Sequence, residues 1–258
     1  MIDTHAHLDD ERFLPDLDAV VQRAVEAGVE AILTVGISVE TSRAAIEIAE
    51  RFETVYAAVG IHPNCAAAAK PGDWEQIVAM TEHPKVVAVG ETGLDLYWDD
   101  TPFDMQQEYL ARHFTLSRER GLPILIHSRD CNDQTVEAIR RAAEPGPVHG
   151  LVHAFSGSME MAEACLELGL SLSFAGMTSY TNKKFNALRE VAATVPDDRI
   201  LIETDAPYLV PHPLRGKEKR NEPSLMVHTA RSLAELRGVS YETFDAQTTA
   251  NTRRLLGI

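Results

Sequence analysis

Cysteine is scarce in this chain of 258 residues, and its spacing does not suit cross-linking. The three cysteines, Cys65, Cys131 and Cys165, are odd in number, lie far apart and form no C-x-x-C pair. A disulfide framework and a thiolate zinc cage are therefore not expected. Cysteine usage of this kind is typical of a cytoplasmic protein.

Long hydrophobic runs are also missing. No apolar stretch approaches the roughly 18 residues that a membrane-spanning helix needs. Met1 leads directly into a short apolar segment that carries two histidines, which leaves no room for a signal peptide. We therefore expect a cytoplasmic protein that does not associate with membranes.

Positive charge is in short supply. Lysine and arginine total 24 against 39 aspartates and glutamates, a formal net charge of −15. This balance disfavours non-specific adhesion to polyanions such as nucleic acids. A phosphate-containing substrate would have to be met locally, by metal ions or by the short basic segment at residues 215–220, which is equally consistent with a solvated loop.

The chain contains no linker rich in proline, glycine or serine, no low-complexity segment and no repeat of 20 to 50 residues. Its length fits either two small domains or one α/β barrel, whose usual size is about 250 residues. Because nothing separates two compositional halves, we expect a single domain over residues 1–258.

Short apolar, β-branched runs alternate with helical patterns along the chain. Apolar spacings of three and four indicate helices that stop near Gly28, Gly121 and Gly169. Nearly continuous apolar strands, each followed by a helix, predict a parallel sheet, and eight such units predict an α/β fold of the (β/α)8 TIM-barrel type. The predicted strands are residues 2–8, 31–37, 55–62, 86–91, 123–129, 151–156, 170–175 and 200–205.

An open, doubly wound sheet is the main alternative fold. That fold would require a glycine-rich phosphate loop after the first strand. The residues that follow His7 are Leu-Asp-Asp-Glu, which contain no glycine, so the barrel is favoured.

His5 and His7 occupy alternate positions of the first predicted strand, so their imidazoles face the same side. Two imidazoles about 7 Å apart by strand rise can converge on one metal ion, although satisfied surface or core histidines would show the same spacing. Further polar residues at the ends of other predicted strands favour a metal site: His62, Glu91, His127, His153 and Asp205. In a barrel, these ends meet at one mouth.

Four of these histidines and two carboxylates exceed the ligands of one tetrahedral metal and suit two divalent ions that share a carboxylate. Glu91, between Gly90 and Gly93 in the segment GETGLD, is the expected bridge. Zinc, magnesium and manganese are all compatible with such ligands. Asp205 is the expected general base, with Glu203 as its competitor.

Substrate contacts are predicted around this centre. His62 and Arg129 are placed to donate to phosphate oxygens, and Tyr208 is placed either to stack on a base or to pack against Pro207. Cys65 has no paired base and is not expected to be a nucleophile. The other histidines are expected to be surface or core residues: His83, His113, His149, His212 and His228.

Six motifs in order resemble the TatD family of metal-dependent hydrolases. They are DTHAH (3–7), GIHP (60–63), GETGLD (90–95), PILIHSR (123–129), HAFSG (153–157) and ETDAPYL (203–209), and the resemblance extends to NTRRL (251–255). It implies an amidohydrolase-like TIM barrel with His5, His7, Glu91 and Asp205 around one ion and Glu91, His127 and His153 around the other.

The resemblance also implies a divalent-metal DNase that acts as a 3′–5′ exonuclease on single-stranded DNA or another phosphodiester through a metal-bound hydroxide. An ester or amide substrate, such as an aminoacyl-tRNA ester or a lactone, remains the alternative, because the same hydroxide would attack it. A barrel that has lost catalysis is disfavoured, because every ligand position is retained. We expect a monomer with no protein partner.

One loop departs from the family pattern. The usual RGKRNEP is here RGKEKRNEP at residues 215–223, which is two residues longer. The ligand set is unaffected, but the predicted contact between Arg220 and the substrate depends on how the longer loop folds.

Overall fold

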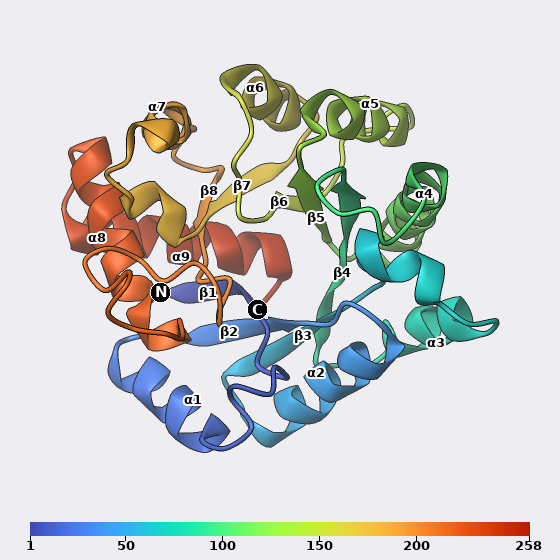
Figure 1. The fold of residues 1–258 in the computed structure, drawn as a ribbon, viewed down its shortest axis with the longest axis horizontal. Coiled ribbons are helices and arrows are strands. Elements are labelled where there is room, and N and C mark those ends of the chain that lie inside the picture. Colours follow the sequence, from blue (N-terminus) through green and yellow to red (C-terminus); the bar gives the residue numbers. More distant parts are fainter.

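A computed structural model describes residues 1–258. Eight strands form one parallel sheet in which each strand neighbours the next one in the sequence, and the sheet curls into a barrel (Figure 1). The strands are β1 (Ile2–Ala6), β2 (Ala31–Val35), β3 (Val55–Val59), β4 (Val86–Asp95), β5 (Ile124–Arg129), β6 (Gly150–Val152), β7 (Ser171–Phe174) and β8 (Ile200–Ile202).

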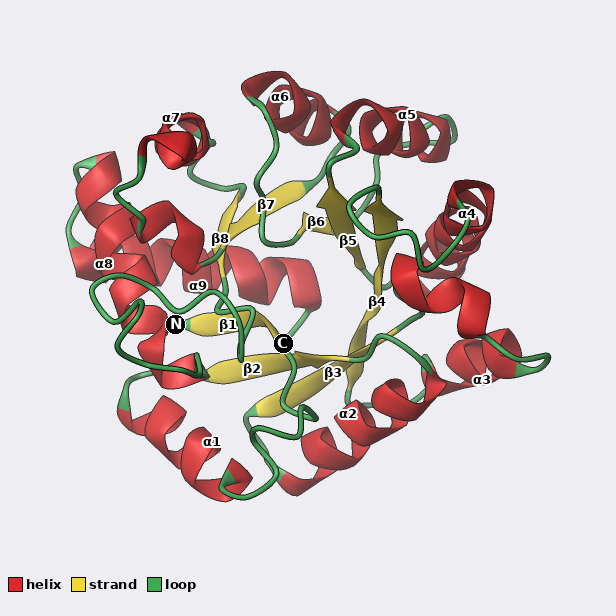
Figure 2. Cartoon of the chain, viewed as in Figure 1, coloured by secondary structure: helices red, strands yellow, loops and turns green.

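Helices surround the strands as an outer ring, except the last one, which lies across one end of the barrel (Figure 2). They are α1 (Leu17–Glu26), α2 (Val39–Arg51), α3 (Asp73–Met80), α4 (Phe103–Arg120), α5 (Asn132–Ala142), α6 (Met159–Glu167), α7 (Asn186–Thr194), α8 (Met226–Arg237) and α9 (Tyr241–Leu256). Short 3₁₀ turns lie at Pro63–Ala68, Gly176–Ser179, Lys183–Phe185 and Pro223–Leu225. None of the helices has the length and apolarity that crossing a bilayer requires.

The last strand returns to the first. Ala6 and Ala206 form a parallel bridge, and the backbone N–H of Asp205 donates to the carbonyl of His5 at 2.9 Å. The predicted (β/α)8 barrel is therefore confirmed, and the open sheet is excluded.

Two apolar layers hold the barrel. The larger lies between the strands and the surrounding helices, and the smaller fills the barrel interior with side chains such as Leu33, Leu125 and Leu201. Leu256 of α9 joins the inner cluster, while the Asn251 side chain donates to the carbonyl of Ile200 at 2.9 Å, at the start of β8. Helix α9 therefore closes the amino-terminal end of the barrel and leaves the opposite end open.

Strand ends differ most from the prediction. The strands expected to end at His62 and Asp205 end three residues earlier, at Val59 and Ile202, whereas β4 continues four residues beyond Glu91. The backbone leaves the strand early where a side chain turns across the barrel mouth. At Asp205 this turn has a φ of 53°. The predicted helix stops at Gly28, Gly121 and Gly169 are confirmed, since helices α1, α4 and α6 end at or just before them.

Candidate active site

The predicted polar residues converge at the carboxyl-terminal mouth of the barrel. Three lie within strands β1, β4 and β5, and three follow the ends of β1, β6 and β8. They are His5, His7, Glu91, His127, His153 and Asp205, and together with His62 their ligand atoms form three overlapping groups, each within 4.8 Å.

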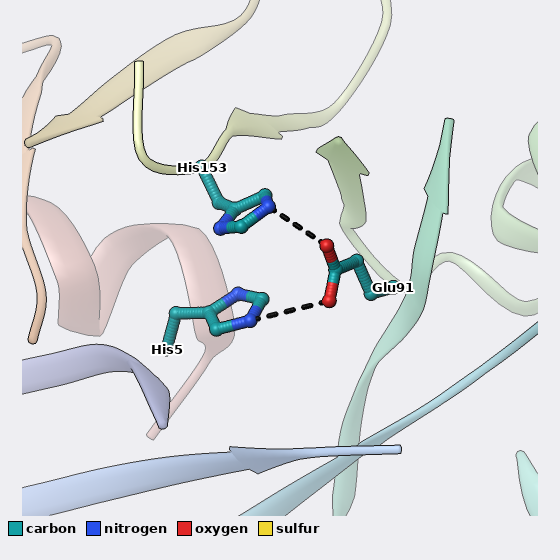
Figure 3. A group of neighbouring side chains, drawn as sticks. All are labelled: His5, Glu91 and His153. Atoms are coloured by element: carbon teal, nitrogen blue, oxygen red, sulfur yellow. Dashed lines mark ion pairs between the residues drawn. The ribbon is translucent and has the colours of Figure 1, made fainter. Parts of the chain in front are cut away.

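Glu91 stands between two pairs of histidines. Its Oε2 atom lies 3.3 Å from Nε2 of His5 and 3.8 Å from Nε2 of His7. Its Oε1 atom lies 2.8 Å from Nε2 of His153 and 3.0 Å from Nδ1 of His127. Figure 3 shows the carboxylate with one oxygen toward His5 and the other toward His153. Each oxygen of the buried carboxylate therefore serves a different pair.

Asp205 completes the first of these groups. Its Oδ1 atom lies 3.7 Å from Nε2 of His7 and 4.0 Å from Nε2 of His5. The carboxylate keeps 15% of its side-chain surface exposed, so it faces the open mouth. Burial raises the pKa of Asp205 to about 6, against the opposing attraction of nearby His153 and His7.

Hydrogen bonds on the far side of two imidazoles determine which nitrogen faces the centre. Nδ1 of His7 lies 3.1 Å from the carbonyl of Val35, and Nε2 of His127 lies 3.0 Å from Oδ2 of Asp95. Because a carbonyl and a carboxylate only accept, these ring nitrogens carry the hydrogens. Nε2 of His7 and Nδ1 of His127 therefore present lone pairs to the centre.

The inward nitrogens also face one another. Nε2 of His5 and Nε2 of His7 are 3.2 Å apart, and Nδ1 of His127 and Nε2 of His153 are 3.3 Å apart. Two lone pairs at this separation repel unless a proton or a cation lies between them. The converging donor set therefore fits divalent metal ions.

The charges at the centre favour a cation. The surrounding histidines outweigh the burial of Glu91 and hold the pKa of its carboxyl well below the usual range. Burial opposes protonation of His153, but Glu91 and Glu203 outweigh it and raise the pKa of His153 well above its usual value. This anionic centre attracts positive charge, from a proton or from a metal.

Two buried carboxylates support the second histidine pair. Asp95 holds His127, as described above, and Glu203 lies 3.4 Å from Nδ1 of His153. Oε1 of Glu203 also accepts the backbone N–H of Ala154 at 2.8 Å. Carboxylates behind ligating histidines orient the rings and raise their basicity.

His62 also faces Glu91, but it presents a hydrogen to the centre where His7 and His127 present lone pairs. Its Nδ1 accepts the backbone N–H of Asn64 at 3.1 Å, so Nε2 carries the hydrogen in the neutral ring. Nε2 lies 3.4 Å from Oε1 of Glu91. His62 is thus arranged as a hydrogen-bond donor, and its pKa is lowered because it is buried.

The three predicted substrate residues Arg129, Tyr208 and Arg220 differ in whether they are free to contact a ligand. The guanidinium of Arg129 lies 3.7 Å above the Tyr97 ring and makes no hydrogen bond or ion pair within the chain. Tyr208 is exposed beside His7, with ring centroids 6.2 Å apart. Arg220, by contrast, is bound to Asp16 at 2.7 Å and to Glu222 at 3.4 Å in an ion-pair network.

Asp95 and the supporting contact of His113 were not predicted from the sequence. Asp95 ends the quoted GETGLD motif, which was its only signal. His113, expected to be a surface or core histidine, is buried, and its Nε2 accepts the N–H of Ile61 at 3.0 Å and so supports the backbone next to His62. Cys65 lies near the centre, where burial and Glu91 raise the pKa of its thiol and make it a poor nucleophile.

Comparison with known proteins agrees with this geometry. A model of the TatD related DNase family matches residues 2–257. The uncharacterized metal-dependent hydrolase YabD of Bacillus subtilis (strain 168) is 41% identical over 258 residues, covering 100% of this chain and 99% of that protein. The 3′-5′ ssDNA/RNA exonuclease TatD of Klebsiella pneumoniae (strain 342) is 34% identical over 264 residues, covering 100% and 98%.

A solved structure shares the fold along the whole chain. The TatD homolog YJJV of Escherichia coli K12 superposes with a TM-score of 0.92 at 33% identity and covers 100% of this chain and 98% of its own. Barrel and ligand set together define an enzyme of the metal-dependent hydrolase class. Within that class, the chain belongs to the TatD family.

Proposed function

We propose that this TatD family hydrolase is a two-cation deoxyribonuclease that removes nucleotides from the 3′ end of single-stranded DNA or a similar phosphodiester strand. The orientation of Glu91 carries the proposal, because one oxygen faces the His127 and His153 pair and the other faces the His5 and His7 pair. This arrangement suits a carboxylate shared by two ions. Relatives named 3′-5′ ssDNA/RNA exonuclease support the reaction and its polarity.

The residues present fit two ions. His5, His7 and Asp205 would hold one, His127 and His153 the other, and Glu91 both. Bound divalent ions would neutralise phosphate charge and lower the pKa of a water molecule. Zinc, manganese and magnesium all accept these ligands, so the native ion has to be found by experiment.

Asp205 is the proposed general base. Its carboxylate faces the mouth, where a water molecule can reach it, and attack on phosphorus requires a group that accepts the water's proton. Glu203, the competing base, is fully buried and already accepts the N–H of Ala154. Position therefore favours Asp205.

Three further residues are proposed to bind the substrate. His62 would donate its Nε2 hydrogen to a phosphate oxygen, and Arg129 would offer the free edge of its guanidinium. Tyr208 would contact a base or sugar at the mouth. We propose that Arg220 instead holds the elongated loop in place through Asp16.

The deciding experiment uses a single-stranded oligonucleotide labelled at the 3′ or the 5′ end, with Mg²⁺, Mn²⁺ or Zn²⁺ added after metal removal. We expect stepwise loss from the 3′ end that depends on the metal and is abolished by Glu91→Gln. Glu53→Gln, an exposed position at the amino-terminal side of β3, is the matched control. Full activity in a chelated sample, or in Glu91→Gln, would show that the two-cation proposal is wrong.

The alternative substrate class is tested in the same preparation. The net charge of −15 disfavours polyanions and is the one observation that supports an ester or amide substrate. Turnover of p-nitrophenyl esters or simple lactones, with no cleavage of oligonucleotides under any metal, would transfer the proposal to that class.

We also propose that the chain acts in the cytoplasm, as a monomer, with residues 1–258 forming one TatD-like barrel. Its three cysteines are unpaired, as is usual in a reducing compartment. Sedimentation of the purified protein tests the monomer, since a stable dimer would contradict it.

A further inference from the structure

The exposed aromatic side chains are not scattered over the surface. Only three are more than a third exposed: Tyr97 at 53%, Trp98 at 51% and Tyr208 at 48%. Tyr97 and Trp98 lie two and three residues beyond the end of β4 at Asp95, and Tyr208 lies three residues beyond Asp205. All three therefore border the mouth that holds the histidine cluster.

These aromatic side chains form two groups, Tyr97 with Trp98 and Tyr208 alone, and an arginine lies over each group. The Arg129 guanidinium lies 3.7 Å from the centroid of Tyr97 and 6.0 Å from that of Trp98. On the other side, the Arg12 guanidinium lies 4.6 Å from the centroid of Tyr208. Aromatic rings combined with arginine are the usual elements of a surface on which nucleic-acid bases stack.

The two groups stand across the mouth from one another. Tyr97 and Trp98 belong to the β4 and β5 side, whereas Tyr208 and Arg12 belong to the β8 and β1 side. In a closed barrel of eight strands taken in order, these sides are half a turn apart. The Glu91 cluster lies between them.

Asp95 connects Tyr97 and Trp98 to the histidine cluster around Glu91. Oδ1 of Asp95 accepts the backbone N–H of Tyr97 at 2.8 Å and of Trp98 at 3.1 Å. Oδ2 of the same carboxylate accepts from His127 at 3.0 Å. The backbone of the aromatic pair is therefore held at a defined place relative to His127.

We propose that Tyr97, Trp98 and Arg129 form a nucleobase-stacking subsite for the substrate strand, which crosses Glu91 toward Tyr208. This inference rests on the proposed function. The Trp98 ring offers the stacking face, because one face of Tyr97 is covered by Arg129 and the two aromatic rings meet edge to face at 4.8 Å. Arg129 keeps its N–H edge for the adjoining phosphate.

Charge favours bases over backbone phosphates as the main contact. Asp99 and Asp100 follow Trp98 directly, and the whole chain carries −15. Phosphates would be repelled at the outer edge of the subsite, whereas stacking is insensitive to this charge. A base can stack on Trp98 only when it is unpaired, so the subsite selects single strands over duplexes.

Tryptophan emission tests the subsite directly, since the chain has only two tryptophans, Trp74 and Trp98. Trp74 is partly buried against Tyr109 and His113, and Trp74→Phe leaves Trp98 as the sole reporter. Glu91→Gln is added to prevent turnover. We expect saturable quenching by a thymidine oligonucleotide and much weaker quenching by the matching duplex or by an abasic strand of equal length.

Variants in a background with both tryptophans tie this signal to the substrate. Trp98→Ala should weaken oligonucleotide binding roughly 5- to 150-fold, the range for loss of one stacked base. Trp98→Phe should restore part of the binding affinity. Val25→Ala, at an exposed apolar position outside the mouth, should leave the affinity unchanged. For Trp98→Ala, kcat/KM on an oligonucleotide should fall by the same factor relative to kcat/KM on bis(p-nitrophenyl) phosphate.

The outcomes separate the subsite from the proposed function. Cleavage of oligonucleotides by the wild type with no Trp98 response would overturn the subsite and leave the nuclease proposal standing. No hydrolysis of any phosphodiester by the wild type would overturn the nuclease proposal, whatever Trp98 reports. Emission that changes with protein concentration and not with oligonucleotide would assign the aromatics to self-association and also overturn the subsite.

Discussion

His127 and Asp95 form a buried pair in which Nε2 of the imidazole lies 3.0 Å from Oδ2 of the carboxylate. The other ring nitrogen, Nδ1, faces Glu91 at 3.0 Å. Asp95 therefore selects the tautomer that presents a lone pair to the metal centre, while its second oxygen holds the loop after β4 through Tyr97. Asp95 is a positioning residue that links ligand chemistry to the shape of the mouth.

Asp95→Asn should weaken metal binding by about 10- to 100-fold, because an amide no longer provides an anionic acceptor for the His127 ring. Titration calorimetry with Mn²⁺ or Zn²⁺ measures the change, and a circular dichroism melt checks that the fold persists. Asp99→Asn, an exposed carboxylate four residues away, is the control. Equal affinities in all three proteins would remove the positioning role from Asp95.

Metal loading should stabilise the whole chain. A cation at a concentration 100 times its dissociation constant adds about 2.7 kcal/mol per site, which for a protein of this size raises Tm by about 5–10 °C. Thermal melts after chelator dialysis, with Mn²⁺ or Zn²⁺ added back, measure the shift, and equilibrium dialysis counts the ions. We expect two per chain and fewer in Glu91→Gln. A Tm that does not change with any divalent ion would contradict the metal site.

The buried imidazole of His113 should make stability depend on pH. Burial lowers its pKa from 6.5 to about 4, and Nε2 accepts the N–H of Ile61, so the folded protein requires the neutral ring. The unfolded chain takes up the proton first as the pH falls below 6.5. The stability contributed by the neutral ring is therefore complete above pH 6.5 and is lost as the pH falls toward 4.

Urea unfolding at pH 7 and pH 5 checks this sign. About 2 kcal/mol of the wild-type loss between these pH values should be absent in His113→Gln, which should already be less stable at pH 7. His149→Gln, an exposed position, should behave as the wild type does. A His113→Gln variant with the same pH dependence as the wild type would refute the assignment.

Gly93 should tolerate no side chain. It has a φ of 152°, and an added Cβ would lie 1.9 Å from the carbonyl oxygen of His127 on the adjacent strand. Because that oxygen belongs to a ladder in the barrel, Gly93→Ala should cost about 3 kcal/mol or more, or prevent folding. Gly72→Ala, at a φ of 91° with no atom within 4 Å, should cost only about 1–2 kcal/mol. Similar urea midpoints for the two variants would contradict the clash.

Much of the barrel could be predicted from local patterns. Alternation of apolar strands with helices depends on neighbours in the sequence, and it predicted eight strands in order. The ends of these strands were less predictable, as His62 and Asp205 show by lying three residues beyond β3 and β8. Where a strand ends depends on what its last side chains must reach across the mouth, which a local pattern does not record.

The candidate ligands were predictable for a related reason. Histidines and carboxylates at strand ends are recognisable one segment at a time, and barrel topology alone implies that they meet. The ion pair of Arg220 with Asp16 was less accessible, because it joins two segments 204 positions apart. Such a partner is visible only once the loops are packed together.

By itself, the sequence determined the fold type, the family and the residues available to bind metal, because periodicity and residue chemistry are properties of short segments. Only the tertiary structure decided which nitrogen of His7 and His127 faces the centre and how the two oxygens of Glu91 are shared. Those choices depend on hydrogen-bond acceptors such as Val35 and Asp95, which distant strands bring behind each ring. Contacts of this kind arise from packing, and no segment specifies them alone.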